Sequence, residues 1–199
     1  MTYWRASGYF SSGVFEMLGE SLGNFVLREG KMLLVTSIHL SEGDKKAIEE
    51  GTISLSSTVN TRLKQVILEE FRAPLPEGTK ILTNMLKLGA LEIKVATRSD
   101  GGLYHEKLGV FFEEKVETPT PKSNFDYDSP DSVTFSGSQN ETRAANIRNY
   151  ESIDVFTSWQ DSRRAKKKRD HFRRLWSGNV PSIVTFVLFL MFFFMCIAC

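Results

Sequence analysis

Residues 103–114 read LYHEKLGVFFEE, and this largely apolar run of strand length predicts a β-strand. Side chains at positions i and i+2 of a strand point to the same face, so we expect His105 and Lys107 to project together while Glu106 points away. A histidine beside a fixed ammonium suits chemistry on an anion such as a phosphodiester. Imidazole can attack or carry a proton near neutral pH, and the lysine can hold negative charge.

A second polar stretch follows at residues 136–140, which read SGSQN. It offers backbone N–H groups, the hydroxyls of Ser136 and Ser138 and the amide of Asn140, all of which can donate to phosphate oxygens. The two stretches together predict a phosphate-binding site built from separate parts of the chain.

The pattern H-x-K followed by G-S-x-N resembles the phospholipase D superfamily. More narrowly, it resembles the phospholipase D-like domains of bacterial restriction nucleases and of DEAD/DEAH-type helicases. Residues 6–13 (ASGYFSSG) are similar to the strand-turn-helix entry of that subgroup, and residues 149–151 (NYE) are similar to its N-x-E. The resemblance covers roughly residues 3–178.

The chain departs from the family at one position. The full family motif is H-x-K-x4-D, and Phe112 stands where the Asp would be. In the nuclease-like branch a Glu after the G-S-x-N segment orients the histidine, and Glu151 is the matching residue. This departure favours a nuclease over a lipase.

The resemblance implies a metal-independent phosphodiesterase with no cofactor. His105 would attack phosphorus and form a phosphohistidine, while Lys107 and Asn140 would hold the non-bridging oxygens. Glu151 would orient the imidazole, and the hydroxyls of residues 136 and 138 would be auxiliary phosphate donors.

The leaving group needs a second acid, and this chain carries only one motif. The resemblance therefore implies a homodimer whose two active sites face each other across a symmetry axis. Two alternatives stay open. One is a membrane-anchored lipid phosphodiesterase, and the other is a non-catalytic nucleic-acid-binding module split from a helicase partner.

The 199 residues fit one α/β domain, for which the resemblance implies a mixed sheet with helices on both faces. The formal net charge is only +1, so the chain as a whole is not a basic nucleic-acid binder. Its positive charge is concentrated in one predicted helix, where a face could grip nucleic-acid phosphates, flank a membrane segment or simply be solvated. The candidate nucleic-acid contacts in that helix are Arg163, Arg164, Lys166, Lys167, Lys168 and Arg169. We expect His171 of the same helix to be solvated.

The C-terminal segment is the second unusual feature. Residues 183–199 read IVTFVLFLMFFFMCIAC, and a run that starts at Val180 just reaches the length of a membrane span. We therefore expect a body at residues 1–178 and a hydrophobic tail at residues 180–199. The tail is either an anchor that leaves the body in the cytoplasm or a replacement for a lost continuation. Both cysteines lie in this segment, so the body has neither a disulfide framework nor a thiolate metal site.

Periodicity and breaker residues predict the remaining elements. The expected strands are 2–10, 31–39, 91–97, 103–114 and 150–156, and the expected helices are 13–28, one opened by Ser41, 58–71, 80–88, 142–147 and 159–176. Residues 117–131 are expected to form a polar, proline-rich loop.

Overall fold

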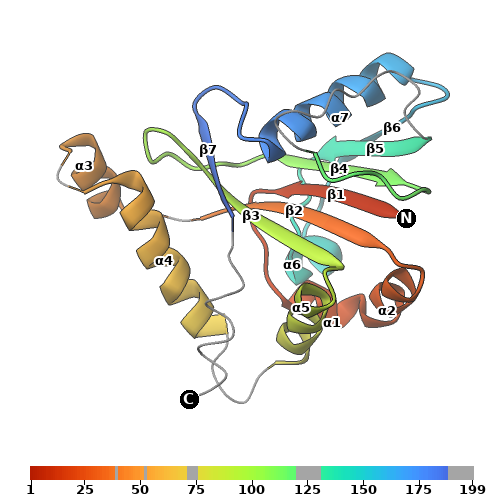
Figure 1. Cartoon of the computed structure of the whole chain (residues 1–199), viewed down its shortest axis with the longest axis horizontal. Coiled ribbons are helices and arrows are strands. Elements are labelled where there is room, and N and C mark those ends of the chain that lie inside the picture. The colour runs from red at the N-terminus through yellow and green to blue at the C-terminus, as the bar shows by residue number, and fades with distance from the viewer. Residues whose placement is uncertain (39, 52, 71–75, 120–130, 188–199) are drawn as a thin grey trace.

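The structure is a computed structural model, and it describes residues 1–199 except 39, 52, 71–75, 120–130 and 188–199. The described residues form one seven-stranded sheet in the order β6-β5-β4-β1-β2-β3-β7 (Figure 1). Its strands are β1 (Thr2–Ser7), β2 (Lys31–Ser37), β3 (Leu91–Arg98), β4 (Lys107–Phe112), β5 (Ser132–Gly137), β6 (Ile153–Thr157) and β7 (Ile183–Val187). Strands β1, β2 and β3 are parallel, whereas all other neighbours pair antiparallel. The predicted mixed sheet is confirmed.

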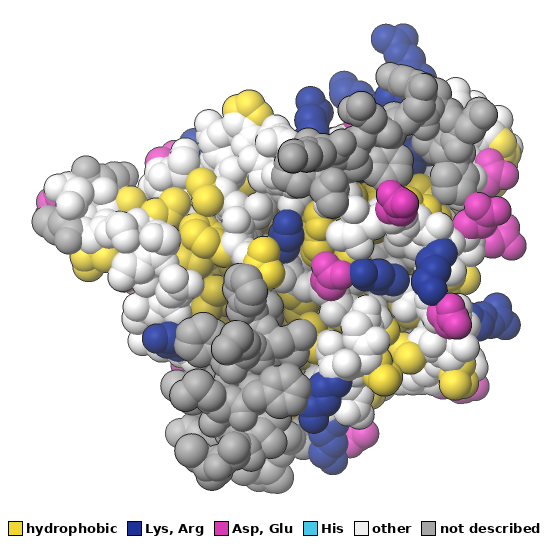
Figure 2. All heavy atoms as spheres, viewed as in Figure 1, with side chains coloured by type: hydrophobic (Ala, Val, Ile, Leu, Met, Phe, Trp, Pro, Cys, Tyr) yellow, Lys and Arg dark blue, Asp and Glu magenta, His cyan; other side chains and the backbone are white. Residues whose placement is uncertain are grey.

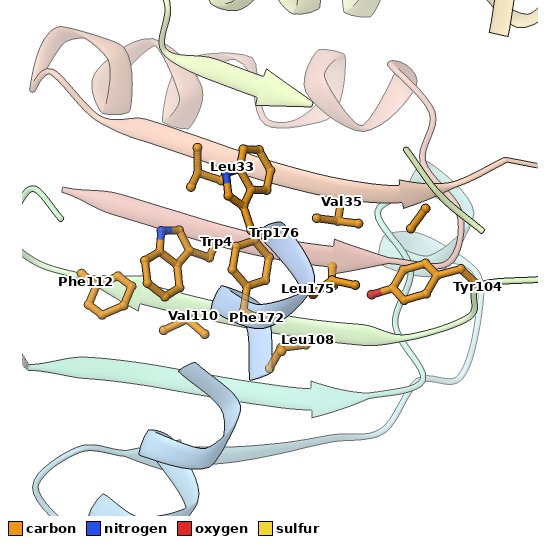
Figure 3. Close-up of a cluster of buried hydrophobic side chains, with 12 residues drawn as sticks. Trp4, Leu33, Val35, Tyr104, Leu108, Val110, Phe112, Phe172, Leu175 and Trp176 are labelled. Atoms are coloured by element: carbon orange, nitrogen blue, oxygen red, sulfur yellow. The ribbon is translucent and has the colours of Figure 1, made fainter. Parts of the chain in front are cut away.

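Helices cover both faces of this sheet. Alternate residues of a strand point to opposite sides, and the inner strands carry apolar residues on both sides that need to be buried. One face packs against α7 (Ser162–Trp176), whose Phe172, Leu175 and Trp176 meet Trp4 and Phe112 from the strands (Figure 3). The other face packs against three helices, which are α1 (Gly13–Met17), α2 (Gly19–Leu27) and α5 (Glu77–Lys87). The predicted single helix over 13–28 is therefore two helices that meet at Leu18.

A third hydrophobic cluster lies where β2 and β3 end. It joins α3 (Glu42–Glu49) and α4 (Leu55–Glu70) to Val95 and Phe186. Helix α3 opens as predicted at Ser41, whose side chain and that of Asp44 form a reciprocal capping box. These helices follow the carboxyl end of β2, at the same end of the parallel strands at which β1 ends, and the short helix α6 (Arg143–Ile147) follows β5 (Figure 1).

Most predicted elements differ from the structure by a few residues at their ends, and two of these differences concern predicted site residues. Strand β4 begins at Lys107, so His105 precedes the strand instead of lying within it. Strand β6 begins at Ile153, which leaves Glu151 in the connection before it. Most of the predicted loop at 117–131 lies outside the described residues, and β5 begins directly after it.

The start of the hydrophobic tail belongs to the sheet. Residues 183–187 form β7, which pairs antiparallel with β3, and both Val180 and Ile183 pack against the core under α7. The expectation that the tail stands apart from the domain is therefore wrong for residues 183–187, and residues 188–199 lie outside the described part. Within the described residues, we find no helix with the length and apolarity needed to cross a bilayer.

Candidate active site

The candidate site forms at the ends of the strands on one side of the sheet, where β1 and β5 end and β4 begins. Ser7 is in register with Lys107, and the segment after β5 returns to the segment after β1 through a parallel bridge between Phe10 and Glu141. Strand order thus brings the H-x-K and S-G-S-Q-N stretches together, as the sequence predicts, along with the Gly8–Ser11 turn.

The imidazole of His105 and the ammonium of Lys107 are in direct contact. Lys107 Nζ lies 2.9 Å from Nδ1 and 2.7 Å from Nε2 of the ring. His105 is exposed and Lys107 is half-buried, so a substrate can reach the pair from solvent. The predicted meeting of these side chains is confirmed, although only Lys107 belongs to the strand.

Gly8 packs against the same imidazole and also lies close to Asn140. A Cβ atom at Gly8 would lie 2.6 Å from His105 Cδ2 and 3.3 Å from Asn140 Oδ1, so only glycine permits this approach. The ring of Tyr9 meets the His105 ring edge to face, with centroids 5.6 Å apart. Tyr9 N donates to Asn140 Oδ1 at 3.0 Å, which leaves the amide N–H groups of Asn140 as the donors that can serve an anion.

Ser138 and Glu151, together with Asn149, form a hydrogen-bonded group beside this cluster. Ser138 Oγ donates to Glu151 Oε2 at 2.5 Å, and Asn149 Nδ2 donates to Glu151 Oε1 at 3.0 Å. Ser136 lies within β5, in register with Leu108 of β4, and is half-buried. It therefore lies one step back from the end of the strand, whereas Ser138 lies at that end.

The charges of Lys107 and Glu151 influence each other. Hydrogen bonds from Ser138 and Asn149 hold the pKa of the Glu151 carboxyl below its usual range, and the charge of Lys107 adds to this effect. Partial burial lowers the pKa of the Lys107 ammonium, and the Glu151 carboxylate opposes that effect. The site thus combines a lysine that gives up its proton more readily than usual with a carboxylate that stays ionised.

Glu106 points away from the site, as predicted. Its side chain connects the segment before β4 to α7. Its Oε2 accepts from Tyr104 Oη at 2.9 Å and lies 2.9 Å from Nε2 of His171 on α7. Burial opposes ionisation of this carboxyl, but the hydrogen bonds from His171 and Tyr104 outweigh burial and lower its pKa. The expectation that His171 is solvated is wrong, because it is half-buried against Glu106.

The basic face of α7 is smaller than the sequence suggests. Figure 2 shows several Lys and Arg side chains gathered at the α7 end of the molecule, and Arg163, Arg164 and Lys167 are exposed. Lys166 pairs with Asp170. Of the other predicted contacts, Lys168 is half-buried, and Arg169 is buried and donates from Nη1 to Ser132 Oγ at 2.5 Å. Arg169 is therefore a packing residue and is wrong as a nucleic-acid contact.

Sequence reasoning missed two residues beneath the site, Arg5 and Glu141. Arg5 is 1% exposed and pairs with Glu141, Nε to Oε2, at 2.5 Å. An arginine in the middle of an otherwise apolar strand was the available signal, since a charge there requires a buried partner. Among the described residues, no group of three or more His, Cys, Asp or Glu side chains could hold a metal ion.

Comparisons with known proteins give few matches. No family model matches the chain, and no curated protein matches it. Among solved structures, the fold is similar to "NucT from Helicobacter pylori", with a TM-score of 0.44 and 12% sequence identity over 93% of this chain and 82% of that chain. At this identity we infer function from the chain's own residues.

Proposed function

We propose that this protein is a metal-independent phosphodiesterase of the phospholipase D type that acts on nucleic acid. The contact between Lys107 and both ring nitrogens of His105 carries the proposal, because it places a nucleophile and a fixed positive charge at one point. Asn140 adds amide donors to the same point, which is the set that a phosphoryl group with growing negative charge requires.

In the proposed reaction a ring nitrogen of His105 attacks phosphorus and the bond from phosphorus to the leaving oxygen breaks. Lys107 and Asn140 hold the non-bridging oxygens as charge accumulates on them. Water then attacks the phosphohistidine, which breaks the N–P bond and frees the histidine. Ser138 supplies a further hydroxyl close to the phosphate, and Glu151 supports the cationic form of the imidazole.

The leaving oxygen needs a proton, and one motif cannot supply both nucleophile and acid. We therefore propose that a second copy of the chain contributes its own His105, so that the active form is a homodimer. Light scattering of the full chain should give the mass of a dimer. A monomer with full activity would contradict this assembly.

Nucleic acid is the favoured substrate for two reasons. Exposed Arg163, Arg164 and Lys167 offer positive charge for a phosphate backbone. The tail that motivated a lipid substrate contributes residues 183–187 to the sheet, which removes part of the proposed membrane segment.

Hydrolysis of a base-free diester, bis(p-nitrophenyl) phosphate, and of a labelled oligonucleotide tests the proposal. Both activities should persist in EDTA and disappear in His105→Ala, and acid quenching should fail to preserve a ³²P-labelled intermediate that alkaline quenching keeps. Lys115→Met is the matched control, because it removes a charge from an exposed ion pair outside the site. Activity that chelation abolishes, or that His105→Ala retains, would overturn the proposal, and DNA binding without cleavage would favour a non-catalytic module.

A further inference from the structure

The ion pair of Arg5 and Glu141 is the least expected feature beneath the site. Both side chains are largely withdrawn from water, at 1% and 12% exposure. Removing two charges from water is costly, and such a pair often adds nothing to stability compared with apolar residues of similar size. Stability alone therefore does not account for its presence.

The Arg5 side chain extends from β1 over the neighbouring strand β4 towards Phe135 of β5. Gly109 of β4 lies in register between Arg5 of β1 and Phe135 of β5. Because Gly109 has no side chain, the Phe135 ring lies over its backbone, and the Arg5 guanidinium lies 5.2 Å from the centre of that ring. The guanidinium therefore lies next to the segment that carries Asn140.

The guanidinium holds the residues on both sides of Asn140. Arg5 Nε donates to Glu141 Oε2 at 2.5 Å, and Arg5 Nη2 donates to the carbonyl oxygen of Gln139 at 2.7 Å. Ser7 Oγ, two residues along the same strand, accepts from Glu141 N at 2.7 Å. Three hydrogen bonds to β1 side chains therefore fix the chain immediately before and after Asn140.

A cavity lies beside this segment. Its volume is about 460 Å³, and Arg5, Gln139 and Glu141 are among the residues that line it. Most of the other lining side chains are apolar and come from α1, α2 and the strands, such as Phe15 and Phe111. The cavity leaves residues 139–141 incompletely packed on one side. The hydrogen bonds from Arg5 therefore hold these residues in place where side-chain packing does not.

We infer that Arg5 and Glu141 are a positioning pair that acts through Asn140, by holding its amide N–H groups toward the phosphate. The inference rests on the proposed function. Neither residue contacts the substrate. Misplacement of a catalytic group by about 1 Å can cost on the order of 100-fold in rate, so loss of the pair should slow turnover strongly.

A double-mutant cycle tests the inference. The apolar replacement Arg5→Met with Glu141→Leu is combined with Asn140→Ala, and kcat on bis(p-nitrophenyl) phosphate is measured for all four proteins. Residues that act as one unit give non-additive effects, whereas independent effects multiply. The pair variant should lose about 10- to 100-fold in kcat in the wild-type background, and little or nothing further once Asn140 is already Ala.

Two single substitutions of Glu141 provide a second measurement in case the pair variant does not fold. Glu141→Gln keeps an oxygen that can accept from Arg5 and should retain most of kcat, while Glu141→Ala should not. Equal losses in both Asn140 backgrounds, an unchanged kcat in the pair variant, or a Glu141→Gln protein as slow as Glu141→Ala would overturn the positioning role. If Asn140→Ala alone has the wild-type rate, the proposed function fails instead.

Discussion

Replacement of Lys107 by Met removes the positive charge that contacts the candidate nucleophile. Two opposite unit charges 4 Å apart attract by about 4 kcal/mol at the effective dielectric constant typical of protein surfaces and by about 1 kcal/mol in bulk water. Lys107 is half-buried, so a value between these limits applies. We expect a loss of about 2–3 kcal/mol of transition-state stabilisation, or roughly 30- to 150-fold in kcat/KM.

The pH dependence gives an independent measurement of the same residue. Partial burial lowers the pKa of Lys107, so its charge should be lost at a lower pH than the ordinary lysine value of about 10.4. Because the reaction needs the protonated ammonium, the rate of the wild-type enzyme should fall on the alkaline side below that value. Lys107→Arg keeps the charge at all accessible pH values and should remove this alkaline fall.

Lys115→Met is the matched control, since Lys115 follows β4 and makes an exposed ion pair with Glu29. It should change the rate little, because exposed ion pairs contribute at most about 1 kcal/mol. Steady-state kinetics on bis(p-nitrophenyl) phosphate between neutral and alkaline pH makes the comparison. A loss in Lys107→Met no larger than in Lys115→Met would refute the electrostatic role, as would an alkaline fall that persists in Lys107→Arg.

Three further variants test other parts of the structure. Glu151→Gln should remain folded by circular dichroism but lose on the order of 10⁴-fold in rate, as expected when the orienting acid of a catalytic histidine is removed; near wild-type kinetics would place that carboxylate elsewhere. His171→Leu should lower the free energy of unfolding by about 1–2 kcal/mol at neutral pH in urea titrations, because Glu106 loses a hydrogen bond that leucine cannot replace. The Glu106 pKa is lowered in the folded state, so this deficit should be present above the usual carboxyl pKa of about 4.3 and vanish as pH falls through the folded value; a deficit that persists in acid would point to packing instead. Arg163→Glu with Arg164→Glu should reduce the slope of log affinity against log salt for duplex DNA by about 1.8, at about 0.9 per lost phosphate contact, and an unchanged slope would show that α7 is only a solvated face.

The sequence predicts the sheet and its helices well where local pattern alone decides the structure. The apolar run of residues 32–35 forms the middle of the interior strand β2, and Ser41 with Asp44 caps α3 as their types and spacing require. The contact between His105 and Lys107 is also correct. It follows from an i, i+2 spacing in extended chain, which brings the two side chains together although β4 itself begins only at Lys107.

Features that depend on distant partners could not be predicted. Burial of Arg169 requires Ser132, a residue of β5 that no local pattern connects to α7. Residues 183–187 illustrate a different ambiguity. A short apolar run is equally compatible with an edge strand and with part of a membrane helix, and only an open edge at β3 decides for the strand.

The pairing of Arg5 with Glu141 joins residues 136 positions apart, and this separation has a consequence for how the protein acquires activity. Strand β4 lies between β1 and β5, so these three strands must all be in register before the bond can form. Contacts of such high sequence separation form slowly, because loop closure costs entropy before any contact compensates for it. During refolding, hydrolysis should therefore return later than helical circular dichroism. A proteolytic fragment that lacks β1, or that lacks the chain from β5 onward, can retain much of its secondary structure and still have no catalytic site.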